Sequence, residues 1–162
     1  MFNQLFENLF PLPTATQEKL FGSFEQIELK RGDYLIKEGD YSSNLFVIES
    51  GLIRQYAWSK KGEWNFQCIS DCLMYRLSKS DYQKMESEII EWNKFEKAFL
   101  AKCFGAMEQR ISDFICLTAE ERYQQYFEQH KSLFHQVPLQ YIASVLGMSP
   151  ETLSRIRAKM SS

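Results

Sequence analysis

The chain has 162 residues, of which 44% are hydrophobic and 15% aromatic, and its formal net charge is −2. This composition supports a packed core in one domain or two small ones, and it excludes wholesale disorder and a uniformly basic nucleic-acid-coating protein. No stretch approaches the ~20 apolar residues of a membrane span, and no Lys or Arg precedes Lys19, so we expect a cytoplasmic protein without a signal peptide or membrane segment.

Two short helices are expected first. Apolar side chains recur at helical spacing from Phe2 to Phe10, and the prolines at 11 and 13 end that helix. Thr14 with Gln17 resembles a capping box, which predicts a second helix to about Phe21. We interpret both helices as packing elements.

The next part of the chain predicts an antiparallel roll. Short apolar runs are expected as strands at 27–29, 34–36, 45–48, 52–58 and 66–77. Gly32, Gly39 and Gly51 lie in the turns between them, where a positive φ is needed. Short strands divided by Gly-containing turns are typical of a small all-β barrel or roll.

The four cysteines are Cys68, Cys72, Cys103 and Cys116. They contain no Cys-x-x-Cys pair, and both histidines, His130 and His135, lie far from them in sequence, so we expect no metal site. The spacing of Cys68 and Cys72 predicts one face of a strand, consistent with a core face.

A long helix follows the roll. Ser80-Asp81 is expected to cap a short helix to Met85, after which apolar residues fall at threes and fours from Ile89 to Met107. A helix this long and apolar packs against its own domain and a partner, so we predict a two-fold dimer seam. Its predicted members are Phe95, Phe99, Cys103 and Ala106.

Two helices joined by a sharp turn are predicted near the C-terminus. Pro138 suits a first helical turn, and Ile142, Ala143 and Leu146 form an inner face that Gly147 ends. Ser149 is a good N-cap for the second helix and Pro150 a good first residue. Leu153, Ile156 and Met160 are expected to face inward, and Glu151, Thr152, Ser154, Arg155, Arg157 and Lys159 outward.

Outward side chains of this kind read base edges or hold phosphates in a helix-turn-helix. From Lys131 onward four basic residues and one acidic residue leave a charge of +3, as a duplex-binding module needs. The alternatives are a solvated helix face and a helical hairpin with a charged exterior.

Two motifs together resemble the Crp/Fnr family of transcription regulators. Residues 32–40 (Gly-Asp-Tyr-Leu-Ile-x-x-Gly-Asp) and 45–51 (Leu-Phe-Val-Ile-x-x-Gly) are similar to the cyclic-nucleotide-binding β-roll. Residues 140–155 (Gln-x-Ile-Ala-x-x-x-Gly-Met-Ser-Pro-Glu-Thr-x-Ser-Arg) resemble the family's helix-turn-helix, and the order of roll, long helix and helix-turn-helix also matches.

The resemblance implies an α+β protein that regulates transcription. Its expected parts are N-terminal helices with an antiparallel β-roll over 1–88, a dimerisation helix over 89–106 and a helix-turn-helix DNA-binding domain over 107–162. It implies a homodimer joined through the long helix, with each recognition helix in a major groove of double-stranded DNA, and it makes RNA polymerase a candidate partner.

By the same resemblance, Glu151 and Arg155 would contact bases, and Ser149, Thr152 and Gln140 would hold phosphates. Ser154 and Lys159 complete the expected DNA-binding set, with Lys159 against phosphate. Pro150 stands where the family often carries a base-contacting Arg, so the preferred half-site is expected to differ.

The family's phosphate-binding cassette is missing near residues 64–66. Gly62-Glu63 looks like half of it, but no suitable Arg follows, and Arg76 lies in a strand. Either the protein lacks the cassette or the natural polypeptide is longer here. We favour a longer polypeptide, because losing central strands would unpair a buried sheet edge. A cyclic nucleotide is thus a candidate effector by resemblance alone, and no effector-binding residues are identified.

Two other classes of function compete with a DNA-binding regulator. The C-terminal helices could dock protein rather than DNA in a ligand-binding or interaction module, and salt dependence distinguishes the two. We do not expect an enzyme, since no nucleophile elbow, zinc-protease motif, P-loop or Rossmann fingerprint occurs.

Overall fold

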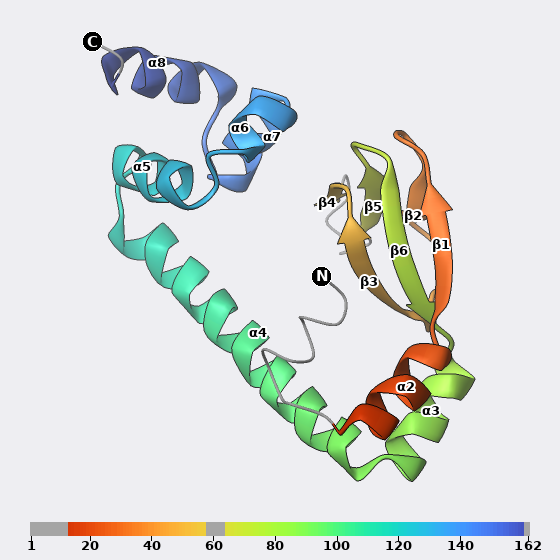
Figure 1. Cartoon of the computed structure of the whole chain (residues 1–162). Coiled ribbons are helices and arrows are strands. Elements are labelled where there is room, and N and C mark those ends of the chain that lie inside the picture. The colour runs from red at the N-terminus through yellow and green to blue at the C-terminus, as the bar shows by residue number, and fades with distance from the viewer. Residues whose placement is uncertain (1–12, 58–63, 161–162) are drawn as a thin grey trace. The chain divides into compact units, whose positions relative to one another are not determined.

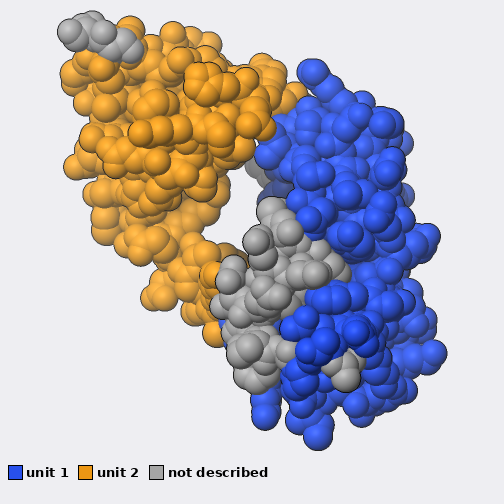
Figure 2. Space-filling view, viewed as in Figure 1, with its two compact units in different colours: residues 1–100 blue, residues 101–162 orange. Residues whose placement is uncertain are grey.

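The computed structural model describes residues 13–57 and 64–160 (Figure 1). The helix expected at residues 2–10 and the Gly62-Glu63 turn lie outside them. The chain divides into two compact units, residues 1–100 and 101–162 (Figure 2). The α+β class and the antiparallel roll are confirmed.

Unit 1 contains two three-stranded antiparallel sheets. The first has the order β1 (Glu25–Leu29), β6 (Cys72–Leu77), β3 (Leu45–Ser50). The second has the order β2 (Tyr34–Ile36), β5 (Asn65–Cys68), β4 (Ile53–Tyr56). The single strand expected over 66–77 is therefore two strands in different sheets, because residues 69–71 carry the chain from one sheet to the other (Figure 1).

The strands next to the expected cassette pair with one another directly. Strand β5 is bonded on one side to β2 and on the other to β4, with Tyr56 opposite Asn65 and Ile53 opposite Cys68. Among the described residues β5 therefore has a partner strand on each side, and the longer polypeptide stays a prediction. Eight residues, 57–64, join β4 to β5, and three, 69–71, join β5 to β6.

The expected turn glycines are confirmed, with φ of 97° at Gly32, 90° at Gly39 and 98° at Gly51. Gly51 is required for a second reason. A Cβ on this residue would lie 2.4 Å from the backbone oxygen of Asp71, in the turn between β5 and β6. The close approach of the two backbones leaves no room for a side chain there.

The helices of unit 1 begin at other residues than the sequence predicts. Helix α2 (Thr14–Gly22) is preceded by Pro13 with no side-chain cap, so the capping box assigned to Thr14 is wrong. Helix α3 (Lys79–Glu88) is capped by Ser78, whose hydroxyl accepts from the Asp81 backbone at 3.1 Å, rather than by Ser80-Asp81. Both predictions erred by one or two positions, the usual uncertainty of helix ends.

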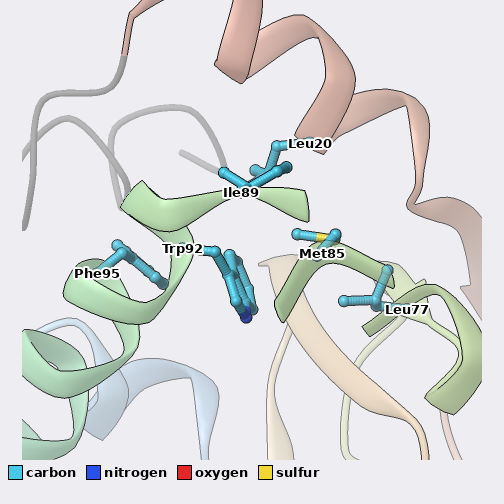
Figure 3. Close-up of a cluster of buried hydrophobic side chains, with 6 residues drawn as sticks. All are labelled: Leu20, Leu77, Met85, Ile89, Trp92 and Phe95. Carbon is cyan, nitrogen blue, oxygen red and sulfur yellow. The ribbon is translucent and has the colours of Figure 1, made fainter. Parts of the chain in front are cut away.

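Helix α4 (Ile90–Cys116) is a single helix that continues ten residues beyond the predicted end at 106. Its first turns belong to the core of unit 1, which Figure 3 shows. The buried side chains of this core are Leu20, Leu77, Met85, Ile89, Trp92 and Phe95. They bring α2, α3, α4 and the end of β6 together.

A second core of unit 1 lies inside the roll, where Cys68, Cys72 and Met74 are buried. The predicted core face of Cys68 and Cys72 is thus confirmed, with 1% and 4% of these residues exposed. Burial raises the pKa of the Cys68 thiol to about 12, so this side chain acts as a small apolar group at neutral pH.

Unit 2 holds the remaining helices: α5 (Ala119–Gln129), α6 (Leu133–Gln136), α7 (Leu139–Val145) and α8 (Pro150–Met160). They enclose one core, made by Tyr123, Ile142, Ala143, Leu146, Leu153 and Ile156. A complete capping box begins α5, with Thr118 and Glu121 bonded to each other's backbone amides. None of the described helices has the length and apolar character needed to cross a bilayer.

Candidate nucleic-acid interface

Helices α7 and α8 form the predicted turn. Gly147 has a φ of 65°, a left-handed conformation that Gly adopts without strain. The amide of Met148 donates to the Ala143 carbonyl at 3.0 Å, which closes the end of α7. Ala143 is fully buried, and its small side chain permits the close packing of α7 against α8. The inner face of Ile142, Ala143 and Leu146 is confirmed.

Ser149 caps helix α8, as predicted. Its hydroxyl accepts from the backbone amide of Thr152 at 3.2 Å, and Pro150 is the first helical residue. The backbone amide of Glu151 and the Ser149 hydroxyl lower the pKa of the Glu151 carboxyl. Glu151 therefore presents an ionised hydrogen-bond acceptor at neutral pH, held at the helix end where negative charge is favoured.

The two sides of α8 differ as the sequence predicts. Leu153 and Ile156 are buried, with 0% and 5% exposed. Thr152 is half-buried and Gln140 is exposed on α7. The exposed members of the predicted set on α8 and its cap are Ser149, Glu151, Ser154, Arg155 and Lys159. Met160 is 49% exposed, so its inward assignment is wrong, because α8 ends there beyond the core.

Two of the predicted DNA-binding cations have partners in unit 2. Nη2 of Arg155 lies 3.4 Å from the Thr152 hydroxyl one turn earlier. Nζ of Lys159 contacts both carboxylate oxygens of Glu120, at 2.8 and 2.9 Å. Glu120 belongs to α5, and sequence spacing carries no signal for this pair.

The exposed apolar stripe of α4 lies further along the helix than predicted. Phe95 is 5% exposed and stacks with Phe99 at 6.1 Å between ring centroids, so both pack in the core of unit 1. The buried Phe95 is therefore a core residue rather than part of an exposed seam. Phe99 is half-buried, and its place in the dimer seam stays a prediction. Cys103 and Ala106 are exposed, as the prediction requires.

A continuous stripe follows within unit 2, which we call the α4 seam. Its members are Phe104, Met107, Ile111 and Phe114, with 70%, 62%, 57% and 41% of their surface exposed. They recur at alternating steps of three and four residues, the spacing of the inner positions of a coiled coil. The sequence carried this signal, but the predicted helix stopped before Ile111.

No family model matches the sequence, and no curated protein matches it. Solved structures do match. The global regulator CLP of Xanthomonas campestris, described as responsive to c-di-GMP, has a TM-score of 0.70 at 14% identity over 92% of both chains. FixK2 of Bradyrhizobium japonicum has a TM-score of 0.70 at 14% identity, over 85% of this chain and 84% of FixK2.

A transcriptional regulator from Eubacterium rectale assigned to the crp/fnr family also matches, with a TM-score of 0.70 at 15% identity. The match covers 96% of this chain and 88% of that one. The chain has the Crp/Fnr fold. At this identity the likeness concerns the fold alone.

The Crp/Fnr roll of this chain contains a cavity of about 420 Å³. Apolar side chains of β1, β2 and β3 form its walls, and polar residues of the 40–44 loop line one side. Arg76, from β6, is the one basic residue among the described lining residues and forms an ion pair with Glu25. Sequence reasoning missed this site, because its walls come from strands and a loop far apart in the chain.

Proposed function

We propose that the protein is a transcription regulator that binds double-stranded DNA in a sequence-specific way through α7 and α8. The carrying observation is the construction of α8. Its inner side is buried, its first residue follows the Ser149 cap, and its outer side exposes an acceptor, Glu151, and a cation, Arg155, one turn apart. Side chains with this placement suit the edges of bases in a major groove.

Within this proposal each exposed residue has a role. Glu151 accepts from a base amino group, and Arg155 donates to a guanine edge. Ser149, Thr152 and Gln140 donate to phosphate oxygens. Ser154 completes the exposed set on α8, and Lys159 leaves Glu120 to bind a phosphate. The exchange is feasible because the Lys159–Glu120 pair is exposed, and such pairs contribute little to stability.

The proposal includes a homodimer. The α4 seam leaves four large apolar side chains exposed on one helix, which a second copy of the helix would cover. Cys103 and Ala106 stand next to Phe104 and Met107 in the sequence and are equally exposed. A two-fold dimer would present two copies of α8 to two half-sites of an operator.

The roll would then carry the effector. Its cavity of about 420 Å³ is within the range of small-molecule sites. CLP, which has the same fold, is described as responsive to c-di-GMP, so a cyclic nucleotide is the first ligand to test. A cytoplasmic location and contact with RNA polymerase belong to the same proposal.

Selection of duplexes from a random pool by the full chain tests the proposal. We expect one sequence to be enriched, and the logarithm of its affinity to fall linearly with the logarithm of salt concentration. Glu151→Ala should lower the affinity for this duplex without lowering that for a scrambled one. Binding of no duplex at low salt would contradict the proposal and favour the protein-docking alternative.

A further inference from the structure

Two arginines bind the backbone just before the turn between α7 and α8. The carbonyl groups at the end of α7 would otherwise lack a helical partner. Nη2 of Arg110 donates to the Val145 carbonyl at 3.0 Å, and Nε of Arg122 donates to the Leu146 carbonyl at 3.2 Å. Positive charge is also favoured at this end of a helix. The two residues before Gly147 thus have their carbonyl groups held by arginine side chains.

Arg122 holds a second helix end as well. Its Nη1 donates to the carbonyl of Leu117, at 2.7 Å, one residue beyond the end of α4. The guanidinium is planar and rigid, so its two bonds orient both carbonyls together. The end of α4 and the end of α7 are therefore fixed relative to each other by one side chain of α5.

Phe114 completes the arrangement. Its ring centroid lies 5.6 Å from the guanidinium carbon of Arg110 and 5.1 Å from that of Arg122. A Cβ on Gly147 would lie 2.4 Å from Cε1 of the same ring. Residue 147 is thus restricted to Gly by its backbone conformation and also by the ring against which the turn packs.

We propose that Arg110, Phe114 and Arg122 form a brace that sets the orientation of the recognition helix and thereby its sequence discrimination. These are positioning residues, since their contacts are with the turn and with the ends of α4 and α7. The inference rests on the proposed function. The inference goes beyond the proposed function, because it assigns part of the discrimination between DNA sequences to side chains outside α8. One of them, Phe114, also belongs to the α4 seam.

Two variants and a matched control test the brace. Arg110→Gln and Arg122→Gln each remove one guanidinium and one charge. Lys131→Gln removes one charge from an exposed residue of the same unit. Affinity is measured for the duplex enriched by the wild type and for a scrambled duplex at one salt concentration. Thermal unfolding and sedimentation report whether each variant stays folded and dimeric.

We expect Lys131→Gln to weaken both duplexes by the same factor. The brace variants should lower the ratio of the two affinities about tenfold, the loss of discrimination that one misplaced base contact would cause. Arg110→Lys keeps a donor and a charge and should retain more of the ratio than Arg110→Gln. If the arginines only stabilised the fold, their variants would have a lower unfolding temperature and an unchanged ratio of the two affinities.

If Arg122→Gln does not fold, Arg110→Gln decides, because Arg110 is exposed and makes one bond to the turn. Folded brace variants that keep the wild-type ratio, or that lose both affinities equally, would overturn the brace. A wild type that enriches no duplex instead overturns the proposed function, and the brace falls with it.

Discussion

At the scale of single residues, the exposed side chains of α8 have different partners. A backbone amide and the Ser149 hydroxyl lower the pKa of Glu151, and Arg155 lies one helical turn away. Lys159 instead reaches α5, where Glu120 neutralises it. These surroundings predict different consequences for the two cations.

Arg155→Ala should relax sequence preference. A bidentate contact from Arg to guanine contributes ~1–3 kcal/mol of discrimination, and in a dimer the loss occurs in both half-sites. Titrations of the enriched and scrambled duplexes at several salt concentrations measure this difference. Equal losses on both duplexes would show that Arg155 acts only through its charge.

Glu120→Gln should strengthen binding to all duplexes, because it frees Lys159 for phosphate without an exchange of partners. Lys159→Ala should weaken all duplexes alike and reduce the salt slope by about one per protomer. The double variant serves as the control, since Glu120→Gln should have little effect once Lys159 is absent. An unchanged salt slope in Lys159→Ala would remove this residue from the interface.

At the scale of elements, side-chain contacts fix several helix ends of unit 2. The α5 box is the most complete, with the backbone amide and the hydroxyl of Thr118 both donating to Glu121 at 2.8 Å. The hydrogen bond from the Thr118 backbone amide, and next to it the one from the Thr118 hydroxyl, lower the pKa of Glu121. This helix in turn positions Arg122 and Glu120.

Thr118→Ala should destabilise the folded state by about 1 kcal/mol, the usual cost of losing an N-cap. Because the pKa of Glu121 is lowered on folding, its stabilisation is present above the ordinary carboxyl pKa, about 4.3, and is lost as the pH falls through the lowered value. Urea unfolding at pH 7 and in acid measures both effects. Thr118→Ser should retain most of the stability, and an equal loss in both variants would argue against the cap.

At the scale of the whole molecule, the apolar side chains of α4 differ in burial along the helix. Trp92 and Phe95, near its beginning, lie in the core of unit 1, and those of the α4 seam are exposed. The same pattern of threes and fours serves folding in the first part and, in our proposal, assembly in the second.

Ile111→Glu should therefore dissociate the dimer while the protomer stays folded, because Ile111 is 57% exposed in the single chain. Phe95→Glu should instead unfold unit 1, since it places a charge in a core. Sedimentation gives the mass of each variant, and circular dichroism its fold. An Ile111→Glu protein that remains dimeric would place the seam elsewhere.

Local signals in the sequence were enough to predict the order of roll, long helix and helix-turn-helix, the turn glycines, the Ser149 cap with Pro150, and the buried and exposed sides of most of α8. Each depends on residues within about one turn of one another, where backbone geometry alone decides. The motifs that resemble the Crp/Fnr family are of this local kind, so the resemblance indicated the fold correctly.

Only the tertiary structure decided which part of the α4 stripe is core, how β4, β5 and β2 pair, and what Lys159 and Arg122 contact. Lys159 and Glu120 are 39 residues apart, and Arg122 and Leu146 are 24 apart. Such contacts depend on how separate elements pack, and neither periodicity nor capping carries that information. For the same reason the turn before α8 was predicted from Gly147, whereas the arginines that hold it were not.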